Sequence, residues 1–176
     1  SKKGTLLWVL DKTSTSMGGR HLRRWINDPL IEVNEINKRL SAVKELKDNV
    51  ILKGDIIENL KKVYDIERLA GKISYGNANG RDMISLKNSL SKLSEVKEVL
   101  KNTNSNMLQE LYNNLDELKD IYELIENSIV EDPPMSVKEG GLIKIGYDEE
   151  IDKLKKATTE GKNWLIQLEA TEKEKT

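Results

Sequence analysis

The run from Met107 to Val130 carries the longest regular pattern of apolar side chains in the sequence. Steps of three and four residues separate its members, which are Leu108, Leu111, Leu115, Leu118, Ile121 or Tyr122, Ile125 and Ile129. This spacing places them in a narrow stripe along one side of a helix, as in helical bundles. Two successive prolines cannot continue a helix, so the pattern ends at Asp132-Pro133-Pro134. We therefore predict a helix over residues 107–130, followed by a boundary.

The same spacing recurs through most of the chain. It predicts helices over residues 32–47, 50–63 and 64–75. A further helical segment begins at Asp82 and is expected to bend near Ser94. Between them, residues 76–80 hold two Gly and two Asn, which suit the positive φ angles of a turn. Only three Pro and no Phe, against many Leu, Ile, Lys and Glu, also favour helix over sheet.

A last helix is predicted from Ile151 to about Lys175. Its apolar stripe weakens at Thr158 and Gly161 and resumes at Trp164. No later segment of this sequence can cover that stripe, so the partner is a missing segment or another molecule. The predicted fold class is all-α: a helical, bundle-like core domain with a long protruding C-terminal helix.

Reactive side chains are few and scattered. Without Cys, the chain can form no disulfide, thiolate zinc site or thiol nucleophile. The only His, His21, lies among Arg residues on a predicted amphipathic helix, where a surface or packing role is commoner than a general base. Neither residues 17–20 nor residues 76–80 match the G-x-x-x-x-G-K-[ST] pattern of a phosphate-binding loop. We predict no catalytic, cofactor-binding or metal-binding residue.

Two charged groups have both a functional and an ordinary interpretation. Asp148, Glu149, Glu150 and Asp152 lack the Gly and the spacing of a calcium loop. We assign them to the first turn of the last helix, where negative charge interacts favourably with the helix dipole. The second group is Asp65, Glu67 and Arg68. We favour local ion pairs on a solvated face. The alternative is that Glu67 or Arg68 faces a neighbouring helix.

Composition limits the possible partners and location. With 37% hydrophobic and 34% charged residues, the chain is typical of a folded, soluble protein. A net charge of −1 gives no global basic field, so strong nonspecific nucleic-acid binding is not implied. The sequence shows no signal peptide and no apolar run near the roughly 20 residues that span a bilayer. We expect a cytoplasmic protein and, because the chain lacks an initial Met, a piece of a longer one.

The stretch from Gly4 to Leu30 is the least ordinary part of the sequence, with two of the three Trp, the His and the densest Arg group. Thr15 or Ser16 is the expected N-cap of an amphipathic helix, and Asp28-Pro29 ends it. The Trp side chains could stack on bases, but all three fall on apolar faces, and we expect them to pack in a core: Trp8, Trp25 and Trp164.

Residues 11–30 contain D-K-T-x-T-x-M-G-x-R-x-L-R-R-W-x-x-x-P-L. This motif resembles the opening of the core (lever) domain in the MutS family of DNA mismatch repair ATPases. Further stretches agree in the same order along the chain: RLSAVKEL at 39–46, YDIERLAGKI at 64–73, GRD at 80–82, and DPPMSVKEGGLIKIGYDEEIDKLK followed by WLIQLEATEKEKT within 132–176. The resemblance covers nearly the whole chain. One departure is Gly80, where family members often have Pro, and we expect it to affect the stiffness of the turn.

The resemblance implies that residues 1–130 are the first part of the core domain and that residues 131–176 are a connection and a truncated stem helix leading into the clamp. It implies a non-catalytic segment that links the ATPase to a DNA-encircling clamp and relays conformational change. ATP and Mg would belong to the parent protein, with no cofactor in this segment. The implied partners are mismatched double-stranded DNA bound through the parent, a second copy in a parent homodimer and a MutL-type repair protein. No membrane partner is implied, and no DNA-binding residue can be assigned.

Two other classes of function remain open from the sequence. The leucine and isoleucine stripes also suit a free-standing helical scaffold or oligomerisation module, which would associate through the last helix. A small enzyme that uses carboxylates and His21 would require a ligand or metal at those residues.

Overall fold

The computed structural model describes residues 3–175, apart from the side chains at 172, 174 and 175. Within that part the all-α prediction is confirmed. The helices are α1 (Leu6–Leu10), α2 (Ser16–Asn27), α3 (Val33–Asp48), α4 (Val50–Lys61), α5 (Ile66–Ser74), α6 (Gly80–Leu90), α7 (Leu93–Leu100), α8 (Asn106–Asn114), α9 (Lys119–Ser128), the 3₁₀ turn η1 (Val137–Glu139) and α10 (Glu149–Lys175). The only bridge between extended residues in this part of the chain is antiparallel and joins Ile129 to Ile143.

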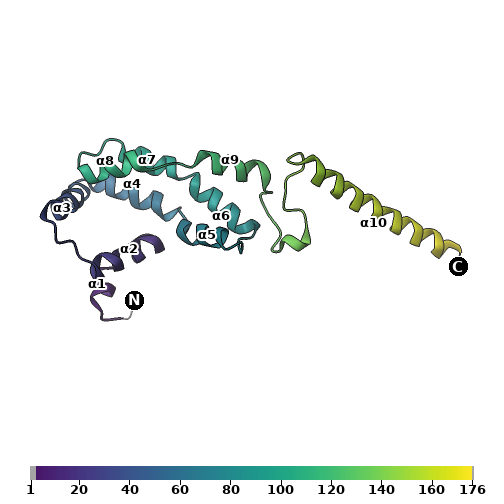
Figure 1. Cartoon of the computed structure of the whole chain (residues 1–176), viewed down its shortest axis with the longest axis horizontal. Coiled ribbons are helices and arrows are strands. Elements are labelled where there is room, and N and C mark those ends of the chain that lie inside the picture. Colours follow the sequence, from purple (N-terminus) through teal and green to yellow (C-terminus); the bar gives the residue numbers. More distant parts are fainter. Residues whose placement is uncertain (1–2, 176) are drawn as a thin grey trace.

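The molecule is elongated (Figure 1). Helices α3 to α9 form a body, α1 and α2 lie against one side of it, and α10 projects from the opposite end. The protruding C-terminal helix is therefore observed as predicted. In the sequence α10 is separated from α9 by a connection, residues 129–148, that contains η1.

Two small cores hold the body together. One joins α5, α6 and α9 through Leu69, Leu86, Leu90, Ile125 and Ile129. The other joins α3, α7 and α8 through Ala42, Val96, Leu100 and Leu108. The bend expected near Ser94 is observed just before it, at Ser91 and Lys92, where α6 gives way to α7. This break lets the two helices contribute to different cores.

The prediction of one helix over residues 107–130 is wrong. The chain leaves the helical conformation after Asn114, and Leu118 adopts a left-handed φ of 50° before α9 begins. Asp116 stabilises this turn because its Oδ1 accepts a hydrogen bond from the Leu118 N–H at 2.9 Å. The apolar pattern continues across the turn because each half buries its own residues, Leu108 in one core and Ile125 in the other.

The prediction that all three Trp pack in a core is also wrong. Trp8 on α1 is 45% exposed and Trp164 on α10 is 60% exposed. Among the described residues neither α1 nor α10 packs extensively against another helix. Trp25 is half-buried, with the Arg39 guanidinium 3.8 Å from its ring centroid.

Candidate functional site at two junctions of the body

The N-terminal arm, which we define as residues 5–27, is stiffened by its own polar contacts. Asp11 Oδ1 accepts hydrogen bonds from the Thr13 N–H at 3.2 Å and the Thr13 hydroxyl at 2.7 Å. Thr15 is the N-cap of α2, as predicted, and its Oγ1 accepts from the Gly18 N–H at 3.0 Å. A Cβ on Gly19 would lie 3.3 Å from Thr13 Oγ1, so the absence of a side chain lets the loop pack on α2. The first half of the D-K-T-x-T-x-M-G motif thus orders the short linker between α1 and α2.

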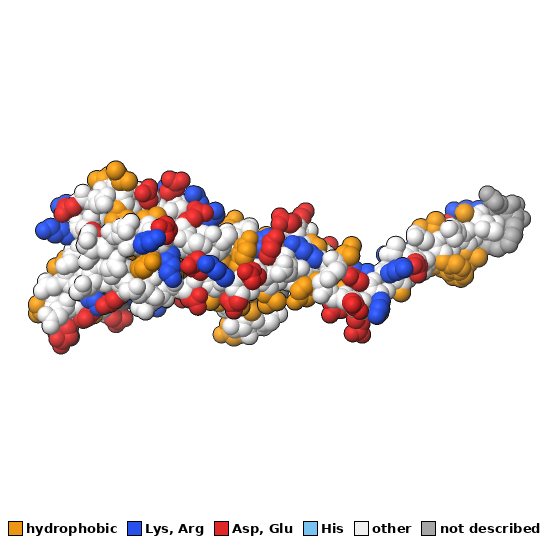
Figure 2. All heavy atoms as spheres, turned by 90° about the horizontal axis from the view of Figure 1, so that it is seen from above, with side chains coloured by type: hydrophobic (Ala, Val, Ile, Leu, Met, Phe, Trp, Pro, Cys, Tyr) orange, Lys and Arg blue, Asp and Glu red, His pale blue; other side chains and the backbone are white. Residues whose placement is uncertain are grey.

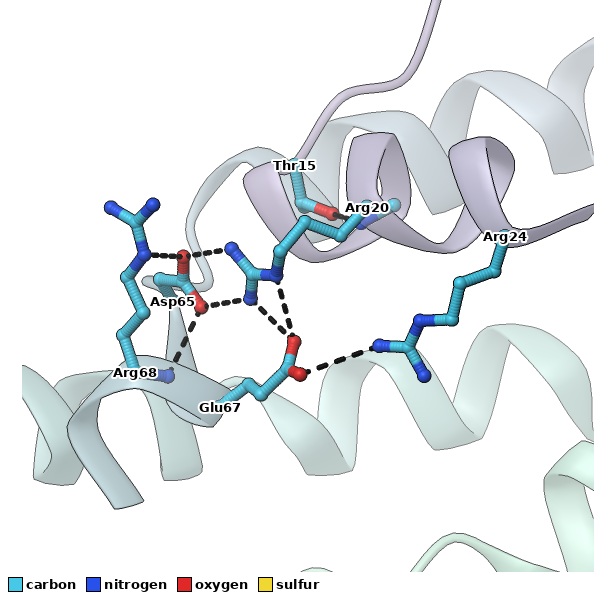
Figure 3. Close-up of polar contacts among 7 residues, drawn as sticks. Thr15, Arg20, Arg24, Asp65, Glu67 and Arg68 are labelled. Carbon is cyan, nitrogen blue, oxygen red and sulfur yellow. Dashed lines mark hydrogen bonds and ion pairs between the residues drawn. The ribbon is translucent and has the colours of Figure 1, made fainter. Parts of the chain in front are cut away.

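Arg20 joins this arm to α5 (Figure 3). Its Nη1 and Nη2 donate to Asp65 Oδ2 and Oδ1, each at 2.7 Å, and its Nε donates to Glu67 Oε2 at 2.9 Å. Arg24, one turn later on α2, pairs more loosely with Glu67 at 3.4 Å. We call these four residues, together with Arg68, the arm cluster. The geometry is the two-pronged match of a guanidinium to a carboxylate, which is strongly directional.

Asp65 has two roles in the arm cluster. It is the N-cap of α5, where its Oδ1 accepts from the Arg68 N–H at 3.3 Å, and it is the main partner of Arg20. The Arg20 hydrogen bonds hold the pKa of the Asp65 carboxyl below its ordinary value, although partial burial acts in the opposite direction. The same contacts raise the pKa of Arg20. Both groups therefore stay charged across the physiological pH range.

The sequence found part of this cluster. The local pair between Arg68 and Asp65 is present at 3.5 Å, as predicted. Glu67 faces α2, which is the alternative we did not favour. The partner, Arg20, lies 45 residues before Asp65 and could not be paired with it from local spacing. The only signal was the unusual density of Arg residues around His21.

The second junction is the stem base, which we define as the connection 129–148 and the first two turns of α10. The connection folds back along the end of α9: the Val130 N–H donates to the Leu142 carbonyl at 3.0 Å, and the Lys144 N–H donates to the Ser128 carbonyl at 2.8 Å. These hydrogen bonds flank the bridge between Ile129 and Ile143. The connection is thus held against the body by backbone contacts.

Charged side chains reinforce the stem base. Lys87 of α6, with a side chain only 7% exposed, donates to Glu126 Oε2 at 2.7 Å and to Glu131 Oε1 at 3.3 Å. Lys144 Nζ of the connection donates to the backbone carbonyl of Glu126 and lies 3.7 Å from Glu126 Oε1. The hydrogen bond to Glu126, opposed by burial, raises the pKa of Lys87. Glu126 therefore joins α6, α9 and the connection.

Gly80 lies where the connection meets the start of α6. It is the buried first residue of α6, and an added Cβ would lie 2.4 Å from Leu142 Cδ1 and 2.5 Å from Pro133 Cβ. Its φ is not in the left-handed region, unlike that of Gly76 at 69°. Gly80 therefore has a packing role, because the connection packs directly on its backbone; the expected effect on the stiffness of the turn stays a prediction.

The helix that begins at Gly80 is well capped. Asn79 accepts from the Asp82 N–H at 2.9 Å, and Asp82 accepts in return from the Asn79 N–H at 3.1 Å, a reciprocal capping box. Lys72 of α5 adds an ion pair to Asp82 at 2.7 Å. The GRD stretch thus fixes the start of α6 at the place where the connection lies.

At the other side of the stem base, the connection holds the start of α10. Lys155 donates to the Ile143 carbonyl at 2.6 Å, and Asp152 Oδ2 accepts from the Gly146 N–H at 2.7 Å. Asp148 Oδ1 accepts from the N–H groups of Glu150 and Ile151, each at 2.9 Å, in agreement with a role at the helix start. In the described part of the chain, no group of three or more His, Asp or Glu could hold a metal ion.

Apolar side chains remain open beside and beyond the stem base. A hollow of about 860 Å³ lies between the connection and the first turns of α10, lined by Val130, Val137, Leu142, Ile145, Ile151 and Leu154 among others. Farther along α10, Trp164, Leu165, Ile166 and Leu168 are exposed. Figure 2 shows apolar side chains gathered along the projecting helix. The stem therefore offers an apolar face that another helix could cover.

The chain's single histidine lies on the N-terminal arm. His21 is exposed on α2, and its ring centroid lies 5.0 Å from that of Trp25. At the arm Arg20 pairs with Asp65 and Glu67, and at the stem base Glu126 pairs with Lys87 and Lys144, so ion pairs join separate structural elements at both junctions. Over residues 3–175, no helix combines the length and the apolar character that crossing a bilayer requires.

The sequence also matches a known domain. The family model for MutS domain III matches residues 1–174. Three similar proteins are each called DNA mismatch repair protein MutS. The one from Alkaliphilus oremlandii is 50% identical over 100% of this chain and 20% of its own length, and the one from Brevibacillus brevis is 52% identical over the same shares. The one from Clostridium beijerinckii is 54% identical over 99% of this chain and 19% of its own length. The chain thus spans about 20% of the length of these relatives.

Proposed function

The chain belongs to the MutS family, in which it corresponds to domain III, and on this premise we propose that it is a non-catalytic relay within a mismatch repair protein. It joins the part that hydrolyses ATP to the part that closes around DNA. Nucleotide state moves the helical body, and the stem helix α10 transmits that movement to the DNA-holding clamp.

The braced stem base is the observation that carries this proposal. A mechanical relay needs its output element fixed to its body, because a loose connection would absorb the movement. Here Glu126 contacts both Lys87 and Lys144, and the Ile143 carbonyl accepts from Lys155 on α10. This series of contacts runs from α6 to the stem.

The division of the chain follows from the same proposal. Residues 1–130 form the first part of the core domain, and residues 131–176 form the connection and the stem that leads into the clamp. Two observations support it: α9 ends at Ser128, and the connection begins at the bridge that involves Ile129.

The activities and partners belong to the parent protein in this proposal. It binds ATP with Mg, acts on mismatched double-stranded DNA as a homodimer, and works with a MutL-type partner in the cytoplasm. Support comes from the names of the relatives, which are DNA mismatch repair proteins. This segment supplies no cofactor ligand in the proposal.

A scaffold role is the alternative, and the exposed apolar residues of α10 favour it. A stem whose Trp164 and Leu168 side chains lie open could pair with a second copy of itself. This alternative predicts self-association through α10 in the full-length protein as well as in the 176-residue chain. The relay predicts that α10 is covered within the full-length protein.

The relay is tested by Lys144→Met in the full-length parent protein. This variant keeps the bulk of the side chain and removes its contacts with Glu126. We expect ATP-triggered release of a mismatched duplex to slow several-fold while the rate of ATP hydrolysis is retained. Lys138→Met, at an exposed lysine of η1, is the matched control and should behave as wild type. Unchanged release in the Lys144 variant would contradict the relay.

A further inference from the structure

The N-terminal arm is attached to the body by charge and not by a buried core. Neither α1 nor α2 contains a buried residue. The apolar side chains of α2, Met17, Leu22, Trp25 and Ile26, are all only half-buried. By contrast, α6 of the body buries Leu86 and Leu90. Burial alone therefore gives the arm much less attachment than the body helices have.

Electrostatic contacts supply what burial does not. All three guanidinium nitrogens of Arg20 donate to carboxylates of α5, which fixes both the distance and the angle between α2 and α5. On the neighbouring side, the Arg39 guanidinium of α3 lies 3.8 Å from the centroid of the Trp25 ring of α2, within cation–π range. The polar attachments of the arm to α5 and to α3 thus depend on arginines.

The side chains of the arm cluster are exposed enough to solvent for salt to weaken their ion pairs. The side chain of Arg20 is 31% exposed, that of Asp65 is 18% exposed and that of Glu67 is 52% exposed. Screening weakens such partly exposed pairs, and the Debye length shrinks from about 10 Å at 0.1 M salt to about 3 Å at 1 M. Pairs in a dry core would respond far less.

The segment that follows the arm can act as a hinge. Residues 28–32, between α2 and α3, form no helix, and four of the five are exposed. Pro29 also prevents the two helices from merging into one. Release of the arm would therefore not require α3 to unfold.

We propose that residues 5–27 form a releasable arm, and that the ion pairs of Arg20 with Asp65 and Glu67 are the latch that holds it on α5. The hydrogen bonds of Asp11, Thr13 and Thr15 order the short linker between α1 and α2, so the arm moves as one unit. A charged surface that competes for Arg20 or for the two carboxylates opens the latch. This inference concerns the arm and not the stem, so it stands or falls independently of the relay.

Spin-label distances in the 176-residue chain test the latch. The chain has no native Cys, so labels can be placed cleanly at Arg23→Cys on the arm and Lys61→Cys on α4, both exposed positions. At low salt we expect one narrow distance distribution by double electron–electron resonance. At 1 M salt a second, broader population should appear, and Arg20→Gln should show that population already at low salt.

Two further variants separate the latch from a general effect of charge. Asp65→Asn removes the charge but keeps an N-cap acceptor for α5, so it should reproduce Arg20→Gln without unfolding the helix. Arg68→Gln removes a positive charge beside the same Asp65, yet Arg68 lies on α5 itself and does not bridge to the arm. It should resemble wild type. The latch is refuted if Arg20→Gln keeps the wild-type distribution at low salt, or if Arg68→Gln broadens it equally.

Discussion

Lys87 and Glu126 form an ion pair between α6 and α9, with 2.7 Å between Nζ and Oε2; the Lys87 side chain is only 7% exposed and that of Glu126 is 37% exposed. A buried charge is strongly disfavoured unless it is paired, so this lysine fixes the spacing of the two helices. Because Glu126 also contacts Lys144 of the connection, the same pair positions the start of the stem. The contacts that position the stem base on the body are therefore polar.

Removal of Lys87 should cost more stability than removal of a surface lysine. Lys87→Met leaves Glu126 without its main partner, and we expect a loss of about 2 kcal/mol in the free energy of unfolding. Lys92→Met removes a surface pair with Glu95 and should change that free energy by less than about 0.5 kcal/mol. Urea denaturation of the 176-residue chain measures both. Equal losses of unfolding free energy in the two variants would show that the pair of Lys87 with Glu126 contributes no more than a surface pair.

Gly80→Ala should destabilise the chain even though Ala is the better helix former. The new Cβ would meet Leu142 and Pro133 at distances that force the connection to move, at an expected cost of about 1–3 kcal/mol. Gly54→Ala is the matched control because nothing lies within 4 Å of a Cβ at that position of α4. It should stabilise the chain by up to about 1 kcal/mol. Thermal denaturation should show shifts of opposite sign, and two shifts of the same sign would contradict the packing account.

Leu118→Gly should be neutral or stabilising, because Leu118 has a left-handed φ of 50° that costs a non-glycine residue about 1–2 kcal/mol. The side chain is 37% exposed, so the packing that is lost offsets part of this gain. Leu124→Gly makes the same change at an exposed position inside α9 and should destabilise by about 1 kcal/mol. Unfolding midpoints distinguish the two outcomes. A larger loss for Leu118→Gly than for Leu124→Gly would mean that the turn is not strained.

Acid should weaken the start of α6. The hydrogen bond from Lys72, opposed by burial, holds the pKa of Asp82 below its ordinary value of about 4. A carboxyl with a depressed folded pKa stabilises the fold above its unfolded pKa, and this stabilisation is lost as the pH falls through the folded value. Asp82→Asn should therefore lose less stability than wild type between about pH 5 and pH 2. Parallel curves for wild type and Asp82→Asn would contradict this assignment.

Local chemistry determined what the sequence could predict. Thr15 begins α2 and Asp28-Pro29 ends it, because capping and the restriction before proline act within a few residues. The turn inside residues 107–130 was missed because the apolar spacing continues through it. The sequence signal for this turn was a group of residues with low helix propensity, Asn113, Asn114 and Asp116.

Contacts between distant segments could not be predicted in the same way. The pairing of Arg20 with Asp65 and the packing of Leu142 on Gly80 depend on how helices meet, which no local pattern specifies. The family resemblance identified the segment and its helical fold. It did not identify these contacts, which only the three-dimensional arrangement reveals.

The central claim is that the stem moves with nucleotide state, and a distance measurement in the full-length parent protein tests it most directly. A dye at Lys162→Cys on the exposed face of α10 and a second dye on a mismatched duplex report the stem-to-DNA distance by energy transfer. The relay predicts that this distance changes when ATP is added and returns when ATP is removed. A distance that is the same with and without ATP, in a protein that still hydrolyses ATP and binds the duplex, would contradict it.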